Sequence, residues 1–312
     1  MAGTETISFE SKAKLMISGE YAVLKGALSL SVPLRFGQKL QIIEKDGSPS
    51  MIWSSLINDT LWLRTTLLLP DFQILETNHK DLSETLRRIL IAAKALNPKF
   101  LERPNKYEVT SEMDFNPDWG IGSGSSLISN IAYWAECDPF ELNRRIFNGS
   151  GYDIACSRSS VPIIYGISNN QPEYREAAFH PTFSNQLYFI YLNRKQNSKQ
   201  SISKLDLSEI SQKDLQTISD LTLALEKATD LTTFQSMMNR HENVISAIIH
   251  ESPVKIRLFD DFEGSVKSLG AWGGDFVLAA SSAPETEVFN YFINKNLTTI
   301  FRYAEMDYTA SP

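Results

Sequence analysis

The chain has 312 residues, which is enough for two domains that each bury a hydrophobic core. Its 42% hydrophobic and 21% charged residues are typical of a globular protein, and the formal net charge of -7 argues against a general binder of nucleic acids or anionic membranes. No apolar run approaches the roughly 18 residues of a membrane-spanning helix. The first residues also lack the layout of a signal peptide.

Cysteine and histidine usage narrows the class further. The two cysteines, Cys137 and Cys156, exclude a disulfide framework and favour a reducing cytoplasm. The four histidines are scattered, and no HExxH, CxxC or GxSxG motif occurs. We therefore expect neither a structural zinc site nor a hydrolase.

The N-terminal third is predicted to be mainly β structure followed by one clear helix. Short strands are expected over 7–44 and irregular β structure over 51–76. The helix is predicted over 81–96, where leucine, isoleucine and alanine recur on one face. Asp81 and Glu84 are expected to form its capping box.

Alternation then changes to helical periodicity. Residues 106–115 alternate between apolar and polar side chains, which predicts a strand with one solvated face. A glycine-serine loop follows, and then an apolar helix predicted over 125–136. A second helix is expected to start at Asp138, with Glu141 completing a capping box and Gly149 just past its end.

The composition changes after Tyr165. Residues 169–184 are polar and contain prolines, so they are predicted to form a linker or domain crossing. We therefore divide the chain into domains at 1–170 and 171–312. The elements predicted beyond the linker are strands at 187–192, 276–280 and 299–303, and helices at 211–229, 231–250 and 285–295. Because helices and strands are mixed in both halves, the predicted fold class is α+β.

The glycine-serine loop between the strand and the apolar helix is a candidate anion site. It consists of Gly120, Ile121, Gly122, Ser123, Gly124, Ser125 and Ser126. Glycine lets the backbone approach an anion closely, and the first N–H groups of a helix have no partner within it. The loop can therefore bind phosphate. The GxxxxGK[ST] motif is absent, and a flexible connection remains the alternative.

Three further segments carry candidate chemistry. Asp153 follows Gly149 and Gly151; it is either a turn former or helix cap, or a positioned acceptor for a substrate hydroxyl proton. The glycine-rich stretch 270–275 is either a hairpin turn or part of a site. Lys14 is either solvated or able to offset charge on a transferring phosphoryl group.

Taken together, these segments resemble the GHMP kinase superfamily, which includes galactokinase, homoserine kinase, mevalonate kinase and phosphomevalonate kinase. The matching blocks, in order, are KLMISGEYAVL (14–24), Pro117 through GIGSGSS (120–126), GSGYDIA (149–155) and SLGAWGGD (268–275). SGEYAVL, GSGYDIA and the GGD ending are closest to the mevalonate-pathway enzymes. The resemblance implies a two-domain fold, with a ribosomal S5 domain 2-like N-terminal domain, a ferredoxin-like C-terminal domain and the active site in the cleft between them.

The resemblance also implies roles for individual residues. Asp153 and Lys14 would be catalytic, and ATP phosphates would bind at Gly120, Gly122, Ser123, Gly124, Ser125 and Ser126. Ser126, and Glu141 from the following helix, would hold Mg²⁺. The substrate would contact Glu20, Tyr21, Ser150, Gly151, Lys195, Lys199, Ser201, Gly273, Gly274 and Asp275. The two lysines of the loop 195–201 suit an anionic substrate.

The sequence also departs from the family pattern. Lys12-Ala13 stands where Pro-Gly is usual, Ser123 replaces a leucine and Trp272 replaces a glycine. The spacing between Ser126 and Asp153 is short, which leaves the magnesium carboxylate open.

The expected function is that of a cytoplasmic, ATP-dependent kinase with Mg²⁺ as cofactor, acting on a small acid such as mevalonate or phosphomevalonate. For a phosphorylated acceptor Asp153 would act by placement, because the attacking oxygen is already ionised. A weakened nucleotide or metabolite sensor, or a kinase for another small alcohol such as a sugar or homoserine, stays open. Neither nucleic acid nor membrane is an expected partner, and the oligomeric state, including a dimer, is undecided.

Overall fold

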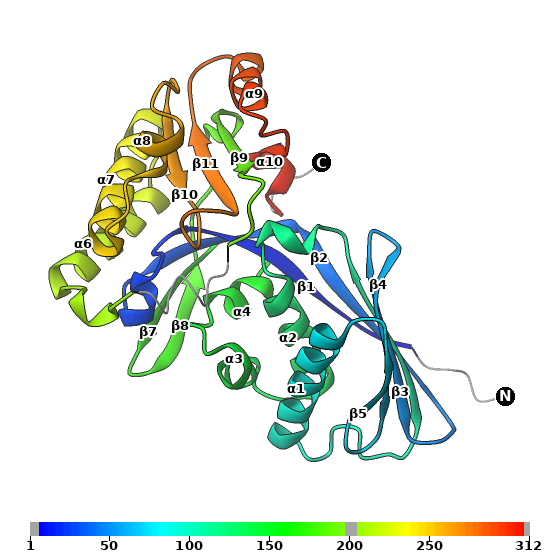
Figure 1. Cartoon of the computed structure of the whole chain (residues 1–312). Helices are drawn as coiled ribbons and strands as arrows, with labels where there is room; N and C mark the ends of the chain where they lie inside the picture. The colour runs from blue at the N-terminus through cyan, green and yellow to red at the C-terminus, as the bar shows by residue number, and fades with distance from the viewer. Residues whose placement is uncertain (1–5, 197–204, 309–312) are drawn as a thin grey trace. The chain divides into compact units, whose positions relative to one another are not determined.

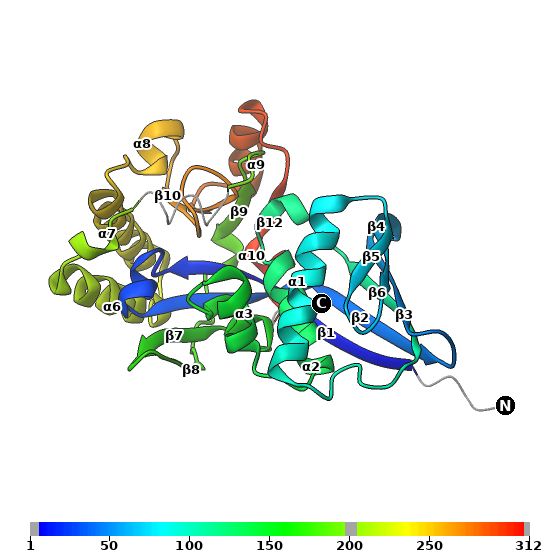
Figure 2. The ribbon, with the colours of Figure 1, turned by 60° about the horizontal axis from the view of Figure 1, so that its bottom comes forward.

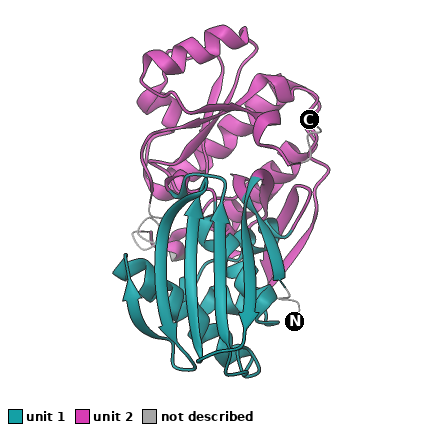
Figure 3. Cartoon of the chain, turned by 90° about the vertical axis from the view of Figure 1, so that its right-hand side faces the viewer, with its two compact units in different colours: residues 1–13, 36–117, 122–158 teal, residues 14–35, 118–121, 159–312 magenta. Residues whose placement is uncertain are grey.

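The computed structural model describes residues 6–196 and 205–308. The chain forms two compact units (Figure 3). Unit 1 comprises residues 1–13, 36–117 and 122–158, and unit 2 comprises residues 14–35, 118–121 and 159–312. Both units are discontinuous, because the long strands β1 (Thr6–Ser18) and β2 (Ser29–Lys45) each contribute residues to both. Composition alone predicts one cut at 170/171; it cannot reveal a strand shared by two units.

Unit 1 is a twisted sheet with helices on one face (Figures 1 and 3). Within it the strands lie in the order β5-β4-β3-β6-β2; β3 pairs with β6 in parallel, and the other neighbours are antiparallel. Its further strands are β3 (Ser50–Ile57), β4 (Thr60–Leu68), β5 (Gln73–Thr77) and β6 (Lys106–Met113). Its helices are α1 (Lys80–Leu96), α2 (Ser123–Trp134), α3 (Pro139–Phe147) and α4 (Tyr152–Ser157).

The core of unit 1 follows the predicted periodicities. Alternate residues of β6 are buried, and α1 buries Leu86, Ile89 and Leu90 against the sheet. Burial of apolar side chains of this kind contributes roughly 1.5–3 kcal/mol each.

The predicted caps were partly wrong. His79, not an Asp81–Glu84 box, caps α1, and Glu84 instead pairs with Arg87. Asp138 does cap α3 by accepting from the backbone N–H of Phe140. Asn148, in the left-handed conformation, is the C-cap of α3, so Gly149 lies just past the helix end, as predicted. Capping depends on which side chain reaches an unpaired N–H, so more than one polar residue near a helix start fits the sequence pattern.

Unit 2 contains a four-stranded antiparallel sheet in the order β10-β11-β9-β12. These strands are β9 (Leu187–Tyr191), β10 (Ser265–Ser268), β11 (Phe276–Ala280) and β12 (Ile300–Arg302). Its helices are α6 (Gln212–Glu226), α7 (Leu231–Ile249), α8 (Val254–Leu258), α9 (Glu285–Asn294) and α10 (Tyr303–Met306). Along the chain, β9 is followed by helices, then by β10 and β11, then by α9 and finally by β12. This order of elements, together with the strand order, is ferredoxin-like, as the resemblance implies. Figure 2 shows α6 and α7 side by side, as their mutual contacts require.

The remaining part of unit 2 corrects one prediction. Residues 169–184 are not only a linker, because β8 (Gln171–Glu176) pairs with β7 (Ile163–Ser168), which in turn pairs with the first residues of β2. Asn169 and Asn170 both have positive φ, as a two-residue hairpin turn requires. β8 is largely exposed and polar, and this composition made it resemble a linker.

Short 3₁₀ helices complete the described chain. They are η1 (Ala22–Lys25), η2 (Pro117–Trp119), η3 (Ser184–Gln186) and η4 (Leu207–Glu209). Across residues 6–196 and 205–308, no helix combines the length and apolarity needed to cross a membrane.

Candidate functional site

The glycine-serine loop leads directly into α2 in unit 1. Gly122 caps the helix with φ of 107°, so the helix begins at Ser123, two residues earlier than predicted. The N–H groups of Ser123, Gly124 and Ser125 have no carbonyl four residues earlier within the helix, because they belong to its first turn. This helix start therefore offers backbone donors and a positive dipole end to an anion.

The hydroxyls of Ser125 and Ser126 donate to acceptors within the protein. Ser126 is fully buried, and its Oγ lies 2.7 Å from Gln38 Oε1, to which it donates. Ser125 Oγ donates to the carbonyl of Gly122 at 3.0 Å. Gln38 is itself fixed, since its Nε2 donates to Ser111 Oγ and its backbone carbonyl accepts from Asn130 Nδ2. The hydroxyls of Ser125 and Ser126 are thus engaged within the protein, which leaves the backbone N–H groups of this turn as donors for an anion.

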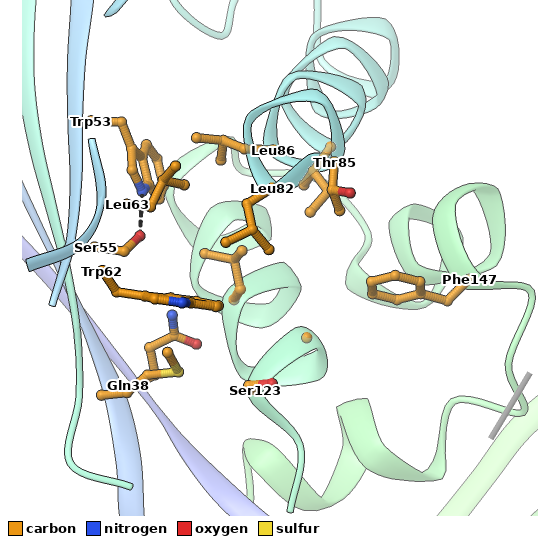
Figure 4. A pocket seen from close by; sticks show the side chains of 14 residues that line it. Gln38, Trp53, Ser55, Trp62, Leu63, Leu82, Thr85, Leu86, Ser123 and Phe147 are labelled. Carbon is orange, nitrogen blue, oxygen red and sulfur yellow. Dashed lines mark hydrogen bonds between the residues drawn. The ribbon is translucent and has the colours of Figure 1, made fainter. Parts of the chain in front are cut away.

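Beside this helix start lies a cavity of about 140 Å³ (Figure 4). Ser123 and Gly124 form part of its wall, and β3, β4, α1 and α3 supply most of the remainder. Figure 4 shows Trp62 between Gln38 and Leu82. The wall is mainly apolar and aromatic; it includes Trp53, Trp62, Leu63, Leu82, Leu86, Ile89, Leu127 and Phe147. Sequence reasoning missed the cavity, because these residues come from distant segments and two tryptophans in an irregular β region were its only signal.

The two predicted magnesium ligands do not fit that role. Ser126 has no exposed surface and its hydroxyl is engaged by Gln38. The carboxylate of Glu141 is held by Arg145 at 3.0 Å and by Arg144 at 2.5 Å, and the Arg145 hydrogen bond is the main cause that lowers its pKa. Among the residues that the structure describes, no group of three or more histidine, cysteine, aspartate or glutamate side chains could hold a metal ion. In this structure both side chains are thus engaged by other residues, and a part for either of them in metal binding with nucleotide present stays a prediction.

Asp153 lies in the first turn of α4, which Gly151 caps with φ of 91°. Its Oδ1 accepts from the backbone N–H of Ile154 at 3.0 Å, and the residue is half-buried. The local geometry fits both readings of the sequence, a helix start and a carboxylate that is held for chemistry. Ser150 and Gly151 lie in the loop just before it.

Asp275 brings several predicted residues together in unit 2. Its backbone has φ of 52°, and its Oδ1 accepts from the backbone N–H of Gln196 at 2.9 Å. The carboxylate lies against Gly120, where a Cβ would come within 2.4 Å of it. Gly274 is equally restricted, because a Cβ there would lie 2.5 Å from the carbonyl of Arg194. Only glycine allows both approaches.

Burial, opposed by nearby charges, shifts the pKa of Asp275. Burial raises the pKa of Asp275 to about 6, although the hydrogen bond from Gln196 and the charges of Lys14 and Lys195 oppose the rise. The buried Lys14 is also bound to the glycine-serine loop, since its backbone N–H donates to the carbonyl of Ile121 at 2.9 Å. Lys195 Nζ forms an exposed ion pair with Asp118 at 3.0 Å.

Other predicted substrate residues are placed differently. Glu20 is buried beside Lys267 and has almost no exposed surface, so it has no direct access to a substrate in this structure. Tyr21 is also buried, and its hydroxyl accepts from the backbone N–H of Trp272 at 2.9 Å. Gly273 adopts φ of 92° in the loop between β10 and β11. Lys199 and Ser201 lie outside the described residues.

Comparison with known proteins establishes the fold. No protein-family model matches the sequence, and no curated protein matches it either. Solved structures do match over nearly the whole chain. Phosphomevalonate kinase of Streptococcus pneumoniae, in complex with phosphomevalonate and AMPPNP, has a TM-score of 0.71 at 15% identity, with 95% of this chain and 99% of that chain covered.

Two further structures show the breadth of the likeness. Mevalonate kinase of Methanococcus jannaschii has a TM-score of 0.69 at 16% identity, covering 96% of this chain and 98% of that one. Galactokinase of Lactococcus lactis, complexed with galactose, has a TM-score of 0.64 at 10% identity, covering 95% and 92%. The chain therefore has the α+β fold of the GHMP kinases, as its motifs predict. Mevalonate and phosphomevalonate kinases are among the particular proteins that share it.

The close approach of Gly120 to Asp275 can be tested with two alanine variants. Gly120 and Gly270 both have positive φ, but among the described residues nothing lies within 4 Å of a Cβ at Gly270. Gly120→Ala must also displace a buried, hydrogen-bonded carboxylate. We therefore expect the free energy of unfolding of Gly120→Ala to be about 1–3 kcal/mol lower than that of Gly270→Ala. Denaturant unfolding measures the difference, and Asp275→Gly should relieve it. Equal losses in the two alanine variants would contradict the contact.

Asp275 also predicts a pH dependence of stability. Its folded pKa of about 6 lies above the ordinary aspartate value of 3.8, so between these pH values the folded state binds more protons than the unfolded state. The contribution of Asp275 to the free energy of unfolding therefore falls as pH rises from about 4 to 6. Because Asp275→Asn lacks this titration, its stability relative to the wild type should rise by up to about 3 kcal/mol over that window. Denaturation at several pH values provides the measurement.

Asp230 supplies a control of opposite sign. It is an exposed cap whose pKa is lowered, mainly by the hydrogen bond from the backbone N–H of Thr233. The contribution of Asp230 is present above its unfolded pKa and lost in acid. Asp230→Asn should therefore lose stability relative to the wild type as pH rises through the acid range. If the two variants show the same trend, the raised pKa of Asp275 is wrong.

Proposed function

We propose that this chain is an ATP-dependent kinase that transfers the γ-phosphate to a small acidic alcohol or phosphate ester, with mevalonate and phosphomevalonate as the first acceptors to test. The observation that carries the proposal is the aromatic-lined cavity beside the start of α2 in unit 1. A planar apolar base suits the cavity, and a phosphate chain suits the backbone donors next to it. ATP combines both groups in one molecule.

The base would lie beside Trp62, and the phosphates would meet the N–H groups of Ser123, Gly124 and Ser125. In this arrangement Gly124 has a steric role, because a Cβ there would lie 3.2 Å from the ring of Phe147 and tighten the cavity wall. Binding of AMPPNP by the similar Streptococcus pneumoniae protein supports the same choice of nucleotide.

The transfer step assigns one role to each remaining catalytic candidate. An acceptor hydroxyl oxygen would bond to the γ-phosphorus while the bond from that phosphorus to the β–γ bridging oxygen breaks and ADP leaves. Asp153 would take the hydroxyl proton, and Lys14 would offset negative charge in the transition state. With phosphomevalonate, whose attacking phosphate oxygen carries no proton, Asp153 would only orient the acceptor. Lys195, with Ser150 and Gly151, would contact the anionic acceptor.

A second candidate function is a sensor that binds nucleotide or metabolite without turnover. The engaged hydroxyl of Ser126 and the arginine-held carboxylate of Glu141 favour it, since neither residue fits Mg²⁺. Because galactokinase has the same fold, a sugar also remains a candidate acceptor. The substrate panel below separates these cases.

Nucleotide binding at the cavity is tested by Trp62→Ala. Loss of one aromatic face beside a base costs about 1–3 kcal/mol, so we expect ATP affinity to fall by about 5- to 150-fold while the Michaelis constant for the acceptor stays unchanged. Isothermal titration with ATP measures the first quantity. Tyr133→Ala is the matched control, because Tyr133 is an exposed aromatic residue of α2 that does not line the cavity. Equal affinities for ATP in the two variants would contradict the proposal that the base binds in this cavity.

Turnover is tested by ADP release with mevalonate, 5-phosphomevalonate, galactose and homoserine. For an alcohol acceptor, Asp153→Asn should lower kcat by about 10²- to 10⁴-fold, because the proton acceptor is lost, while ATP binding persists. With 5-phosphomevalonate the loss should be smaller. Binding without ADP release for every acceptor would support the sensor instead.

A further inference from the structure

Four charged or titratable side chains are buried together in unit 2. They are Glu20, His241, Glu242 and Lys267, and none exposes more than 2% of its surface. Glu20 follows β1, His241 and Glu242 belong to α7, and Lys267 belongs to β10. We refer to these four residues as the Lys267 cluster. The proposed phosphotransfer uses none of them directly.

Lys267 is the centre of the cluster. Its Nζ forms an ion pair with Glu20 Oε1, donates to the carbonyl of Ser268 at 2.8 Å, and lies 4.0 Å from Glu242 Oε2. These contacts give each ammonium proton an acceptor nearby. Burial raises the pKa of Glu20 to about 7, although Lys267 opposes the rise, so the pair does not recover the full cost of burying the carboxylate.

The two α7 residues bind backbone groups. His241 Nε2 accepts from the backbone N–H of Gly19 at 3.0 Å, and burial together with the charge of Lys267 lowers the pKa of His241, so its ring is neutral. Glu242 accepts from the backbone N–H and the hydroxyl of Ser268, at 3.2 and 3.1 Å, and from the backbone N–H of Val254. The cluster thus fixes the chain at Gly19 and at Ser268.

These two points adjoin segments of the candidate site. Gly19 directly follows the strand that carries Lys14, and Ser268 directly precedes the loop 269–275 that carries Asp275. A second link lies next to the first, since Tyr21 OH accepts from the backbone N–H of Trp272. Gly19 itself cannot be replaced freely, because a Cβ would lie 2.5 Å from Ser29 Cβ.

Stability alone does not explain a buried cluster of this kind. Apolar side chains of similar volume often stabilise a fold as well as a buried ion pair or better, because desolvation offsets the attraction between the charges. An ion pair has a different property: it favours one mutual placement of its partners, whereas an apolar contact tolerates sliding.

We propose that Glu20 and Lys267 are positioning residues that hold the turn at 19–21 and the loop 269–275 in one register. The pair acts through Lys14 and Asp275 and touches neither substrate nor nucleotide. The effect of the pair on turnover rests on the proposed kinase function. Its effect on the placement of the turn 19–21 against the loop 269–275 does not, because both segments belong to unit 2. Glu20, predicted from the motif as a substrate contact, thus acts indirectly.

The test replaces both charges by apolar groups in Glu20→Leu/Lys267→Met. We expect a folded protein in which amide hydrogen exchange of Gly19 and Trp272 is about tenfold faster than in the wild type. Their acceptors, His241 and Tyr21, remain, but without the ion pair these acceptors are no longer held opposite the two N–H groups. We also expect kcat to fall by about 10- to 100-fold, as misplacement by about 1 Å can cause. The Michaelis constant for ATP should stay within about twofold, since the nucleotide is proposed to bind unit 1.

Arg175→Met/Glu226→Leu is the matched control. Arg175 and Glu226 form another ion pair of unit 2, with two N–O contacts of 2.7 and 2.8 Å, and Glu226 is buried. This variant should leave both the exchange at Gly19 and Trp272 and the value of kcat as in the wild type. Equal effects of the two double variants would overturn the proposal, because the effect would then be general to ion pairs.

A second variant covers the case in which the first does not fold. Glu20→Gln keeps the shape of the side chain and an oxygen that accepts from Lys267, so we expect a folded protein with intermediate exchange and kcat. Wild-type exchange and kinetics in this variant would overturn the proposal. If the wild type phosphorylates no acceptor, the proposed kinase function fails, yet the exchange comparison still decides whether the pair holds the two segments.

Discussion

The hydrogen bond from Ser126 to Gln38 determines what the glycine-serine loop can offer to a ligand. It turns the hydroxyl into the core, where Gln38 is held in turn by Ser111 and Asn130. The first turn of α2 then faces its surroundings with backbone N–H groups, beginning at Ser123. An anion bound there would be recognised by directional backbone donors and the helix dipole, which need no side-chain charge. The apolar cavity next to this turn extends the same surface toward a planar group.

Unit 2 uses buried carboxylates in a different way. Asp275 and Glu20 both have raised pKa values because burial disfavours their charged forms. Each stays in place through a specific partner, the backbone N–H of Gln196 for Asp275 and the ammonium of Lys267 for Glu20. These contacts join the segment after β9 to the loop 269–275, and β10 to the turn that follows the strand of Lys14. The segments that the motifs single out are therefore connected by polar contacts in the interior.

Local patterns predicted most of the fold. The apolar face of α1 and the alternation of β6 depend on neighbouring residues, so their periodicity was sufficient. β8 was missed because an exposed edge strand has the polar composition of a linker. The cavity and the Lys267 cluster could not be predicted, since Glu20 and Lys267 are 247 positions apart and a lone lysine in a short strand resembles a solvated one. The motifs named the candidate site residues; whether these meet around one nucleotide stays a prediction.

The departure from the family pattern at Trp272 has a packing explanation. Its indole is buried with Tyr21, Ile218 and Ile245, while its backbone N–H donates to Tyr21 and its carbonyl accepts from Gln196 Nε2 at 2.7 Å. A glycine at this position would leave this cluster without a large side chain and the loop with more conformational freedom. By contrast, glycine is retained at positions 120 and 274, where a Cβ would collide with a carboxylate or a carbonyl. Trp272 therefore has a packing role in unit 2, whereas glycine stands at the positions where the backbone and a carboxylate or carbonyl approach closely.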